Sequence, residues 1–110
     1  MNDPIRPATL TLDVGSLDAT ESFYRDVLGA RTQRNGESVR LGFDGFTVVF
    51  EHAPPPERAK LELGLRVDDD ATLKAIAERV GATTYAREGG GRALYVTDPD
   101  QYTIEIFRDA

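Results

Sequence analysis

The sequence predicts a single α+β domain made of two copies of a strand–helix–three-strand unit, which together enclose a cup-shaped pocket. Three observations predict it. Strands and helices are expected in the same order in both halves of the 110-residue chain. Each half ends its predicted helix at a glycine followed by alanine, at Gly29 and at Gly81. The proline-rich segment 53–60 separates the halves. A repeat of about fifty residues is usually a unit that cannot close its own core, so two units are expected to share one.

The first unit spans about residues 8–52. Ala8–Val14 alternates polar and apolar residues with the period of a half-buried strand. After Ser16, a suitable N-cap, Leu17–Leu28 gathers apolar residues on one helical face and stops before a glycine. An Asn-Gly and an Asp-Gly pair, both strong hairpin turns, then separate three predicted strands. These strands are Thr32–Arg34, Ser38–Phe43 and Phe46–Glu51.

The second unit spans about residues 61–107 and repeats this order. Leu61–Val67 alternates like the first strand, and Ala71–Val80 carries apolar residues at helical spacing. The run Asp68–Asp70 can cap that helix and places negative charge at its positive end. Gly89–Gly91 is interpreted as a flexible hairpin end, because the helix and lysine of a phosphate-binding loop do not follow it. The last three predicted strands are Thr83–Ala86, Arg92–Thr97 and Tyr102–Phe107.

Composition excludes several classes of function. A net charge of −6 argues against binding nucleic acid or an anionic membrane surface, and favours cationic or neutral ligands. The chain has no cysteine, which excludes disulfides and thiolate metal sites and predicts a cytoplasmic location. No apolar run is long enough to cross a bilayer, and residues 1–6 lack the apolar core of a secretory signal. We therefore expect residues 1–110 to form one domain with no nucleic-acid or membrane partner.

Three segments resemble the vicinal oxygen chelate superfamily, which includes glyoxalase I, the extradiol dioxygenases and the bleomycin-resistance proteins. The glyoxalase and bleomycin-resistance members are the nearest. Residues 12–29 end in F-Y-R-D-V-L-G, residues 63–69 resemble the strand that opens the second unit, and residues 95–106 resemble the last hairpin. The family usually has a glycine where this chain has Gln101. The resemblance implies a strongly curved sheet with a concave binding face, and homodimers whose sites are often shared between chains.

The resemblance also implies where a metal would lie. Metal-using relatives hold divalent ions on the first and last strand of each unit, which here carry Thr9, Val49, Glu62 and Glu105. Only the two glutamates are credible ligands, because threonine is a poor ligand and valine has no lone pair. A catalytic metal usually needs about three protein ligands. We therefore expect no cofactor and no complete metal site, although two carboxylates could hold a divalent ion weakly.

Tyr95 is expected to line the same pocket. It stands ten residues before Glu105, the spacing at which the extradiol dioxygenases carry an active-site tyrosine before a glutamate ligand. We interpret it as a wall of the pocket that makes one hydrogen bond, the commoner use of a half-buried tyrosine. The predicted ligand-binding residues, none of them assigned a catalytic role, are Thr9, Val49, Glu62, Tyr95 and Glu105.

These features favour a small-molecule-binding protein of the bleomycin-resistance type, which holds a cationic or aromatic organic molecule without turning it over. Such proteins gain affinity by burying apolar ligand surface in a preformed groove. Three alternatives stay open. One is a metal-dependent lyase or isomerase of the glyoxalase type that uses Glu62 and Glu105. Another is a metal-free acid–base enzyme in which these carboxylates share a proton. The third is a regulatory or assembly module that uses only its dimer surface.

Overall fold

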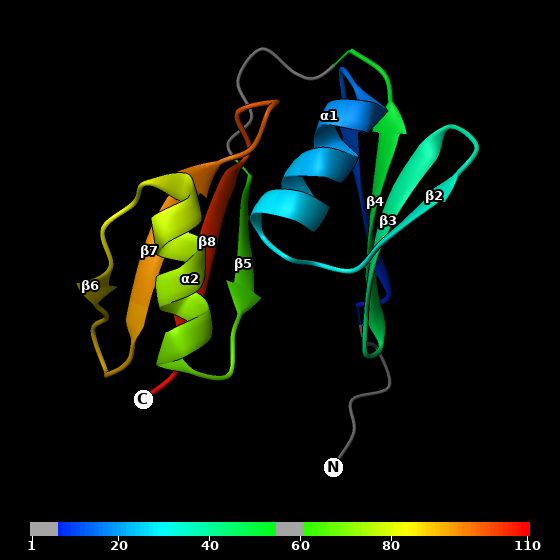
Figure 1. Ribbon diagram of the computed structural model, residues 1–110. Coiled ribbons are helices and arrows are strands. Elements are labelled where there is room, and N and C mark those ends of the chain that lie inside the picture. The colour runs from blue at the N-terminus through cyan, green and yellow to red at the C-terminus, as the bar shows by residue number, and fades with distance from the viewer. Residues whose placement is uncertain (1–6, 55–60) are drawn as a thin grey trace.

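The computed structural model describes residues 7–54 and 61–110, which form two four-stranded sheets (Figure 1). The order is β1-β4-β3-β2 in the first sheet and β5-β8-β7-β6 in the second. In each sheet the first and last strands of the unit are parallel neighbours and the other pairs are antiparallel. The predicted α+β repeat is therefore confirmed. The strands are β1 Thr9–Val14, β2 Thr32–Asn35, β3 Ser38–Phe43, β4 Phe46–His52, β5 Glu62–Arg66, β6 Tyr85–Ala86, β7 Arg92–Thr97 and β8 Thr103–Arg108.

The first predicted helix has two parts. An α-helical segment, α1 (Leu17–Ser22), continues as a π-helical turn, η1 (Phe23–Val27). The Ser16 hydroxyl caps α1 by accepting a hydrogen bond from the amide of Ala19 at 3.1 Å. Gly29 then takes a left-handed φ of 77°, which glycine adopts without strain and which ends the helix as predicted.

The second helix, α2, spans Asp70–Val80. The predicted acidic cap is confirmed at Asp69, whose carboxylate accepts a hydrogen bond from the Thr72 amide at 2.8 Å. That hydrogen bond lowers the pKa of Asp69. The strand after α2 is shorter than the predicted Thr83–Ala86, because Thr84 instead accepts hydrogen bonds from the Arg92 guanidinium through its hydroxyl and its carbonyl. No helix in the described parts of the chain is long and apolar enough to cross a membrane.

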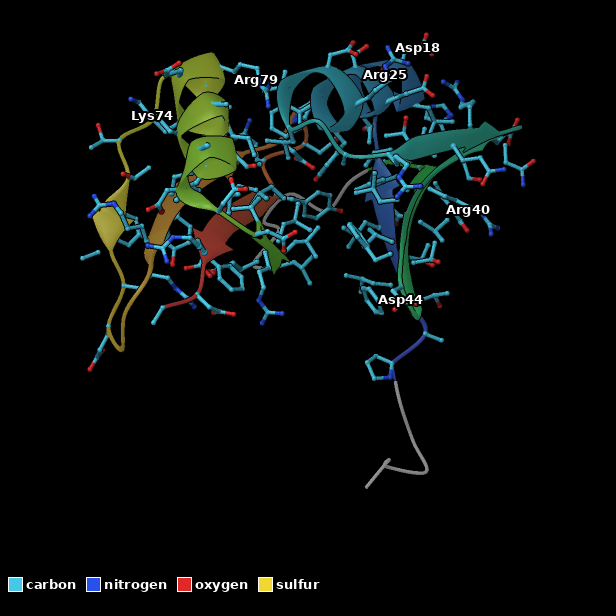
Figure 2. The ribbon with its side chains drawn as sticks, turned by 60° about the horizontal axis from the view of Figure 1, so that its bottom comes forward. Asp18, Arg25, Arg40, Asp44, Lys74 and Arg79 are labelled. Atoms are coloured by element: carbon cyan, nitrogen blue, oxygen red, sulfur yellow. The ribbon has the colours of Figure 1, made fainter. Side chains whose placement is uncertain are left out.

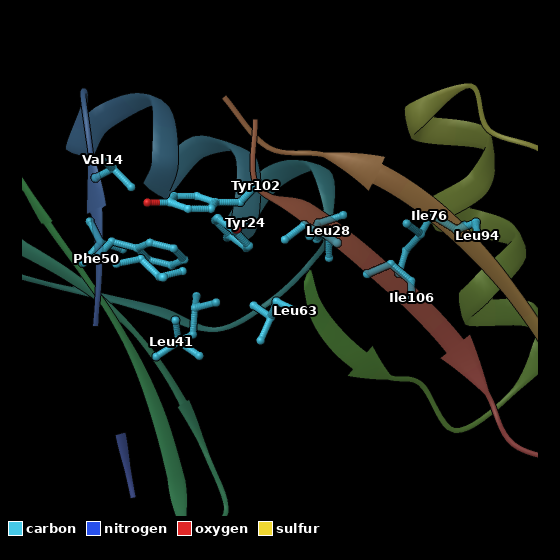
Figure 3. Packing of buried hydrophobic residues seen from close by; sticks show 14 of the residues in the cluster. Val14, Tyr24, Leu28, Leu41, Phe50, Leu63, Ile76, Leu94, Tyr102 and Ile106 are labelled. Carbon is cyan, nitrogen blue, oxygen red and sulfur yellow. The ribbon is translucent and has the colours of Figure 1, made fainter. Parts of the chain in front are cut away.

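The two units share one hydrophobic core, which runs between the sheets (Figure 3). Helix α1 lies between the two sheets, and α2 covers one face of the second (Figure 1). The Tyr24 ring, fully buried, stacks on Phe50 with ring centroids 4.7 Å apart. Leu28 and Leu63 continue the packing toward the second sheet (Figure 3). Both units therefore contribute residues to one core, as the repeat predicts.

The turn between β7 and β8 joins the two units through a buried carboxylate. Asp98, only 2% exposed, accepts a hydrogen bond from the Tyr24 hydroxyl at 2.8 Å. It also accepts hydrogen bonds from the amides of Asp100 at 2.9 Å and Tyr102 at 3.0 Å. Gln101, in the same turn, has a left-handed φ of 70°, which accounts for the glycine that the superfamily usually has there. Asp98 therefore fixes both the shape of its own turn and the position of Tyr24.

The same turn also holds the end of β1. The Asp100 carboxylate accepts a hydrogen bond from the Gly15 amide at 2.9 Å, and the Tyr102 hydroxyl donates one to the Asp13 carbonyl at 2.8 Å. On the other side of the core, Arg79 of α2 donates to the Val27 carbonyl at 2.7 Å. Figure 2 shows Arg79 between the two helices. Hydrogen bonds at both ends of the core thus hold the two units in one orientation.

Candidate functional site

Each sheet has one face that does not pack against its own unit's helix. We call these the outer faces. In the first sheet the outer face carries Thr9, Thr11 and Val49, because Thr11 lies beside Val49 in the parallel pairing of β1 with β4. Arg40 of β3 pairs with Val49 on the same face and projects away from the second sheet (Figure 2). Thr9 is exposed, whereas Val49 is 8% exposed among its strand neighbours. Besides Arg40, this face carries the exposed carboxylates of Asp13 and Glu51, which lie beside each other in the pairing of β1 with β4.

The outer face of the second sheet gathers the other predicted site residues. Tyr95 of β7 lies directly beside Glu105 of β8. On the other side of Glu105 lies Gly64 of β5, and Glu62 points to the same face two residues earlier. Gly64 has no side chain, and a Cβ atom there would lie 3.4 Å from the Phe107 ring. The structure therefore brings Glu62, Tyr95 and Glu105 together on one sheet.

An exposed aromatic pair borders these carboxylates. The rings of Tyr95 and Tyr85 stack with centroids 5.7 Å apart and an angle of 21° between their planes. Tyr95 is 48% exposed and Tyr85 39% exposed, which is high for such large rings. Tyr85, at the start of β6, was not among the predicted site residues. Its pairing with Ala93 of β7, two residues before Tyr95, is the register that brings the rings together.

The Tyr95 hydroxyl stays protonated in this setting. Interaction with the Tyr85 hydroxyl raises the pKa of Tyr95 most, followed by burial and by the nearby carboxylates of Glu105 and Glu62. A phenolate would be repelled by these carboxylates. The group can therefore donate a hydrogen bond to a ligand or a carboxylate, but it is unsuited to act as a general base.

Two arginines complete this face. Arg87, just after β6, lies with its guanidinium carbon 4.1 Å from the centre of the Phe107 ring, and Arg66 of β5 lies 5.5 Å from the same ring. The Arg87 Nε atom is 3.9 Å from Glu105 Oε2. Arg66 therefore lies against Phe107, and Arg87 is the arginine beside Glu105.

Within one chain the predicted residues form two separate sets. Thr9 and Val49 lie on the first sheet, and Glu62, Tyr95 and Glu105 lie on the second. With α1 between the sheets (Figure 1), the outer face of the first sheet is turned away from the second unit. A cleft of about 430 Å³ does lie between the units, but its walls are mostly apolar. It is lined by Leu28–Ala30, Phe43, Phe46, Val48, Leu63–Val67, Thr72, Ile76 and Ile106.

The side chains present do not suit a catalytic metal. In residues 7–54 and 61–110, no three His, Asp or Glu side chains cluster closely enough to hold an ion. His52 ends β4 as an exposed residue, on the strand of the first sheet that also carries Val49. A valine and a threonine at two of the four superfamily positions leave two carboxylates, fewer than the roughly three ligands that a catalytic metal usually requires.

The two repeated units, each with its first and last strands paired in parallel, have the architecture of the vicinal oxygen chelate superfamily. Residues 9–107 match the family described as Glyoxalase-like domain, and the chain belongs to that family. No curated protein sequence matches it.

Solved structures share the fold over nearly the whole chain. A lactoylglutathione lyase from Agrobacterium tumefaciens is 18% identical with a TM-score of 0.75, and the match covers 97% of this chain and 96% of that one. A glyoxalase-related enzyme from Fulvimarina pelagi is 24% identical with a TM-score of 0.78, covering 93% and 86%. An oxidase named ChaP-H2 is 17% identical with a TM-score of 0.79, covering 98% and 96%. At these identities the likeness shows the fold alone.

Proposed function

We propose that this protein binds a small aromatic, positively charged molecule on the outer face of its second sheet and does not turn it over. The observation that carries the proposal is the exposed Tyr85–Tyr95 stack beside Glu105. Stacking on a tyrosine pair contributes binding energy to any planar ring, typically about 0.5–1.5 kcal/mol beyond the area buried. Binding is favoured over metal-dependent turnover because two carboxylates are fewer ligands than a catalytic metal usually requires.

The two carboxylates provide the preference for positive charge. Glu105 is partly buried, with a side chain 16% exposed, so its charge is less screened than that of a fully exposed residue. Its only arginine neighbour among the described residues is Arg87, at 3.9 Å, which is longer than a hydrogen bond. Glu62 on the neighbouring strand is exposed. A cation that stacks on Tyr95 would lie beside both carboxylates.

A matched set of planar probes tests this proposal. Benzamidine is a cation, benzamide its neutral counterpart and benzoate the related anion. We expect benzamidine to bind more tightly than benzamide, and Glu105→Gln to weaken benzamidine binding about three- to tenfold, which corresponds to about 0.7–1.4 kcal/mol. Glu78→Gln, an exposed carboxylate on α2, is the control. Binding is measured from amide chemical shifts in an NMR titration. Equal affinity of wild type and Glu105→Gln for benzamidine would show that the carboxylate has no role.

We further propose that the working site forms between two copies of this chain. Strands β1 and β5 lie at the ends of their sheets, so within residues 7–54 and 61–110 each has an unpaired edge. The first sheet of one protomer, with Thr9 and Val49, would lie against the second sheet of its partner and close the cup. This arrangement would cover both exposed outer faces, including the two tyrosines.

Light scattering tests the dimer, and we expect twice the chain mass of 12.1 kDa. Thr9→Arg, on the exposed outer face of the first sheet, should weaken benzamidine binding at least threefold, because it introduces a positive charge opposite the partner's Glu62 and Glu105. Thr83→Arg, exposed and off both outer faces, should leave binding unchanged. A monomeric mass at every concentration, with Thr9→Arg binding normally, would show instead that each chain binds ligand alone.

The alternative function is an enzyme, either a metal-dependent lyase or isomerase of the glyoxalase type or a metal-free acid–base catalyst. This alternative is supported by the position of Glu62 and Glu105 on one face beside a protonated Tyr95, since carboxylates can accept and donate protons. Thermal unfolding with nickel, zinc, manganese or magnesium distinguishes the metal-dependent enzyme from the metal-free one. An ion that binds only the folded state raises the melting temperature. We expect no rise for the wild type; a rise that disappears in Glu62→Gln and Glu105→Gln would support the metal-dependent enzyme.

A further inference from the structure

We propose that Arg66 and Arg87 form a binding site for the carboxylate or phosphate group of a small molecule, and that the chain's own Asp109 occupies this site in the absence of ligand. The inference extends the proposed function, because the site lies on the same outer face as Tyr95 and Glu105. It adds an oxyanion to the ligand, next to the aromatic ring and positive charge already inferred.

The arrangement around Asp109 is that of a bound anion. Its Oδ2 atom lies 2.7 Å from Nε of Arg66, and its Oδ1 atom lies 3.3 Å from Nη1 of Arg87. Each carboxylate oxygen thus has its own guanidinium. The arginines come from opposite edges of the second sheet, Arg66 from β5 and Arg87 from just after β6, so the fold and not local sequence brings them together. Two guanidinium groups on one oxyanion are a common means of recognising carboxylates and phosphates.

Phe107 holds the two guanidinium groups in place. Its ring lies on β8 between the strands that supply the arginines, with Arg87 at 4.1 Å and Arg66 at 5.5 Å from its centre. A guanidinium over an aromatic face is stabilised electrostatically and loses freedom before a ligand arrives. The Arg87 side chain is accordingly only 29% exposed, although it lies on the surface. The charges are therefore preorganised for an anion.

Asp109 itself is weakly held and can be replaced. Its side chain is 55% exposed and that of Arg66 is 64% exposed, and ion pairs this accessible to water contribute little to stability. Asp109 follows the last residue of β8, so the sheet pairing does not fix its side chain. Its backbone carbonyl accepts a hydrogen bond from Nη1 of Arg108, which lies on the other face of the strand and would not be disturbed. A ligand anion can take the place of Asp109 while both arginines stay on Phe107.

Glu105 limits which anions fit. It lies 3.9 Å from Arg87 and would repel an anion placed close to it. The anion must therefore lie at the Asp109 end of the arginine pair, with the positive part of the ligand at the Glu105 end. A molecule with a planar ring, a cationic group and a carboxylate or phosphate satisfies both ends.

Replacing Asp109 by asparagine tests the inference, because the change removes the competing charge and keeps the side-chain shape. By NMR titration we expect benzoate or phenyl phosphate to bind D109N at least threefold more tightly than wild type, with benzamide unchanged. Arg66→Gln and Arg87→Gln should each weaken oxyanion binding at least fivefold. Arg31→Gln, an exposed arginine that precedes β2 and lies in no strand, should not. The ratio of benzoate to phenyl phosphate affinity shows which oxyanion the site prefers.

The outcomes separate this inference from the proposed function. If benzamidine binds and responds to Glu105→Gln, but neither oxyanion binds D109N more tightly than benzamide does, the oxyanion site is wrong and the proposed function stands. If D109N binds an oxyanion equally well with and without Arg87, the site is also wrong. Oxyanion binding that depends on both arginines, in a protein that does not bind benzamidine, would support the site and contradict the cationic ligand. Melting temperatures of D109N and Arg66→Gln should match the wild type, because both side chains are more than half exposed. The partly buried Arg87 and Glu105 call for a folding check of Arg87→Gln and Glu105→Gln from their amide spectra.

Discussion

Replacing Asp98 by alanine is expected to destabilise the protein by about 3–5 kcal/mol, a third or more of the stability of a typical domain. The change removes the acceptor of three hydrogen bonds, from the Tyr24 hydroxyl and from the amides of Asp100 and Tyr102. It also leaves the buried Tyr24 hydroxyl without a partner, which costs about 1–3 kcal/mol by itself. Urea unfolding followed by circular dichroism measures the effect.

Companion variants identify the cause of this loss. Tyr24→Phe removes only one of the three hydrogen bonds and should cost about 1–3 kcal/mol. Asp98→Asn keeps an oxygen for the two amides and should cost less than Asp98→Ala. Asp68→Ala, at an exposed position, should change stability by less than about 0.5 kcal/mol. If Asp98→Ala were no more harmful than Asp68→Ala, the carboxylate would not hold the units together.

The Asp98 carboxyl group should also make stability depend on pH, with a sign opposite to the usual one for an aspartate. Burial raises the pKa of Asp98 above its ordinary value, despite the three hydrogen bonds that oppose this shift. The folded protein therefore binds the Asp98 proton more tightly than the unfolded chain does. This contribution to stability is complete below about pH 3.9 and is lost as the pH rises through the folded pKa. The free energy of unfolding of the wild type, relative to that of Asp98→Asn, should consequently fall as the pH rises from about 3.9 through the folded pKa.

Gly91→Ala is expected to have an effect of similar size, about 3–5 kcal/mol, for a purely steric reason. A Cβ atom at this position would lie 2.0 Å from the Arg108 carbonyl oxygen, where backbone atoms cannot move aside. Its φ of 83° is also one that alanine adopts only with strain. The β7–β8 pairing of Arg92 with Arg108 would have to shift to accommodate the methyl group. Thermal and urea unfolding both measure the loss.

Gly42→Ala is the matched control. Gly42 lies in β3 with no neighbouring atom within 4 Å of the added Cβ, and its φ is not left-handed. Alanine there should be neutral or slightly stabilising, because it restricts the unfolded chain. The Gly91 carbonyl accepts a hydrogen bond from the Arg87 amide at 3.1 Å, so Gly91→Ala should also weaken oxyanion binding. A Gly91→Ala protein as stable as Gly42→Ala would contradict the close approach to Arg108.

The repeat could be predicted from local sequence because its signals are local. Alternation in Ala8–Val14, the cap at Ser16 and the stops at Gly29 and Gly81 act through neighbouring residues, and each was found where expected. The hairpin end predicted as flexible at Gly89–Gly91 requires glycine at position 91, which the local sequence does not indicate. The need for glycine at Gly91 comes from Arg108, which is distant in the chain.

For the binding site, the sequence predicted which residues share a pocket but not how the outer faces of the two sheets are placed. The resemblance to the superfamily placed Glu62 and Glu105 in one pocket, with Tyr95 added by its spacing to Glu105, and the structure has all three on one side of one sheet. The sequence did not identify Tyr85 or Arg87, because β6 is short and its register depends on the turn at 87–91. The ion pair of Arg66 with Asp109 could likewise not be predicted from the sequence, because side-chain direction at a strand end depends on tertiary packing.

The sequence by itself therefore determined the doubled unit, its family resemblance and the loss of donors at Thr9 and Val49, since these depend on residue type and spacing. Only the tertiary structure decided how the units are oriented. The Asp98–Tyr24 hydrogen bond and the shared core place α1 between the sheets, and so leave the outer faces apart in one chain. The physical reason is that this orientation results from contacts between residues more than seventy positions apart, which no local pattern records.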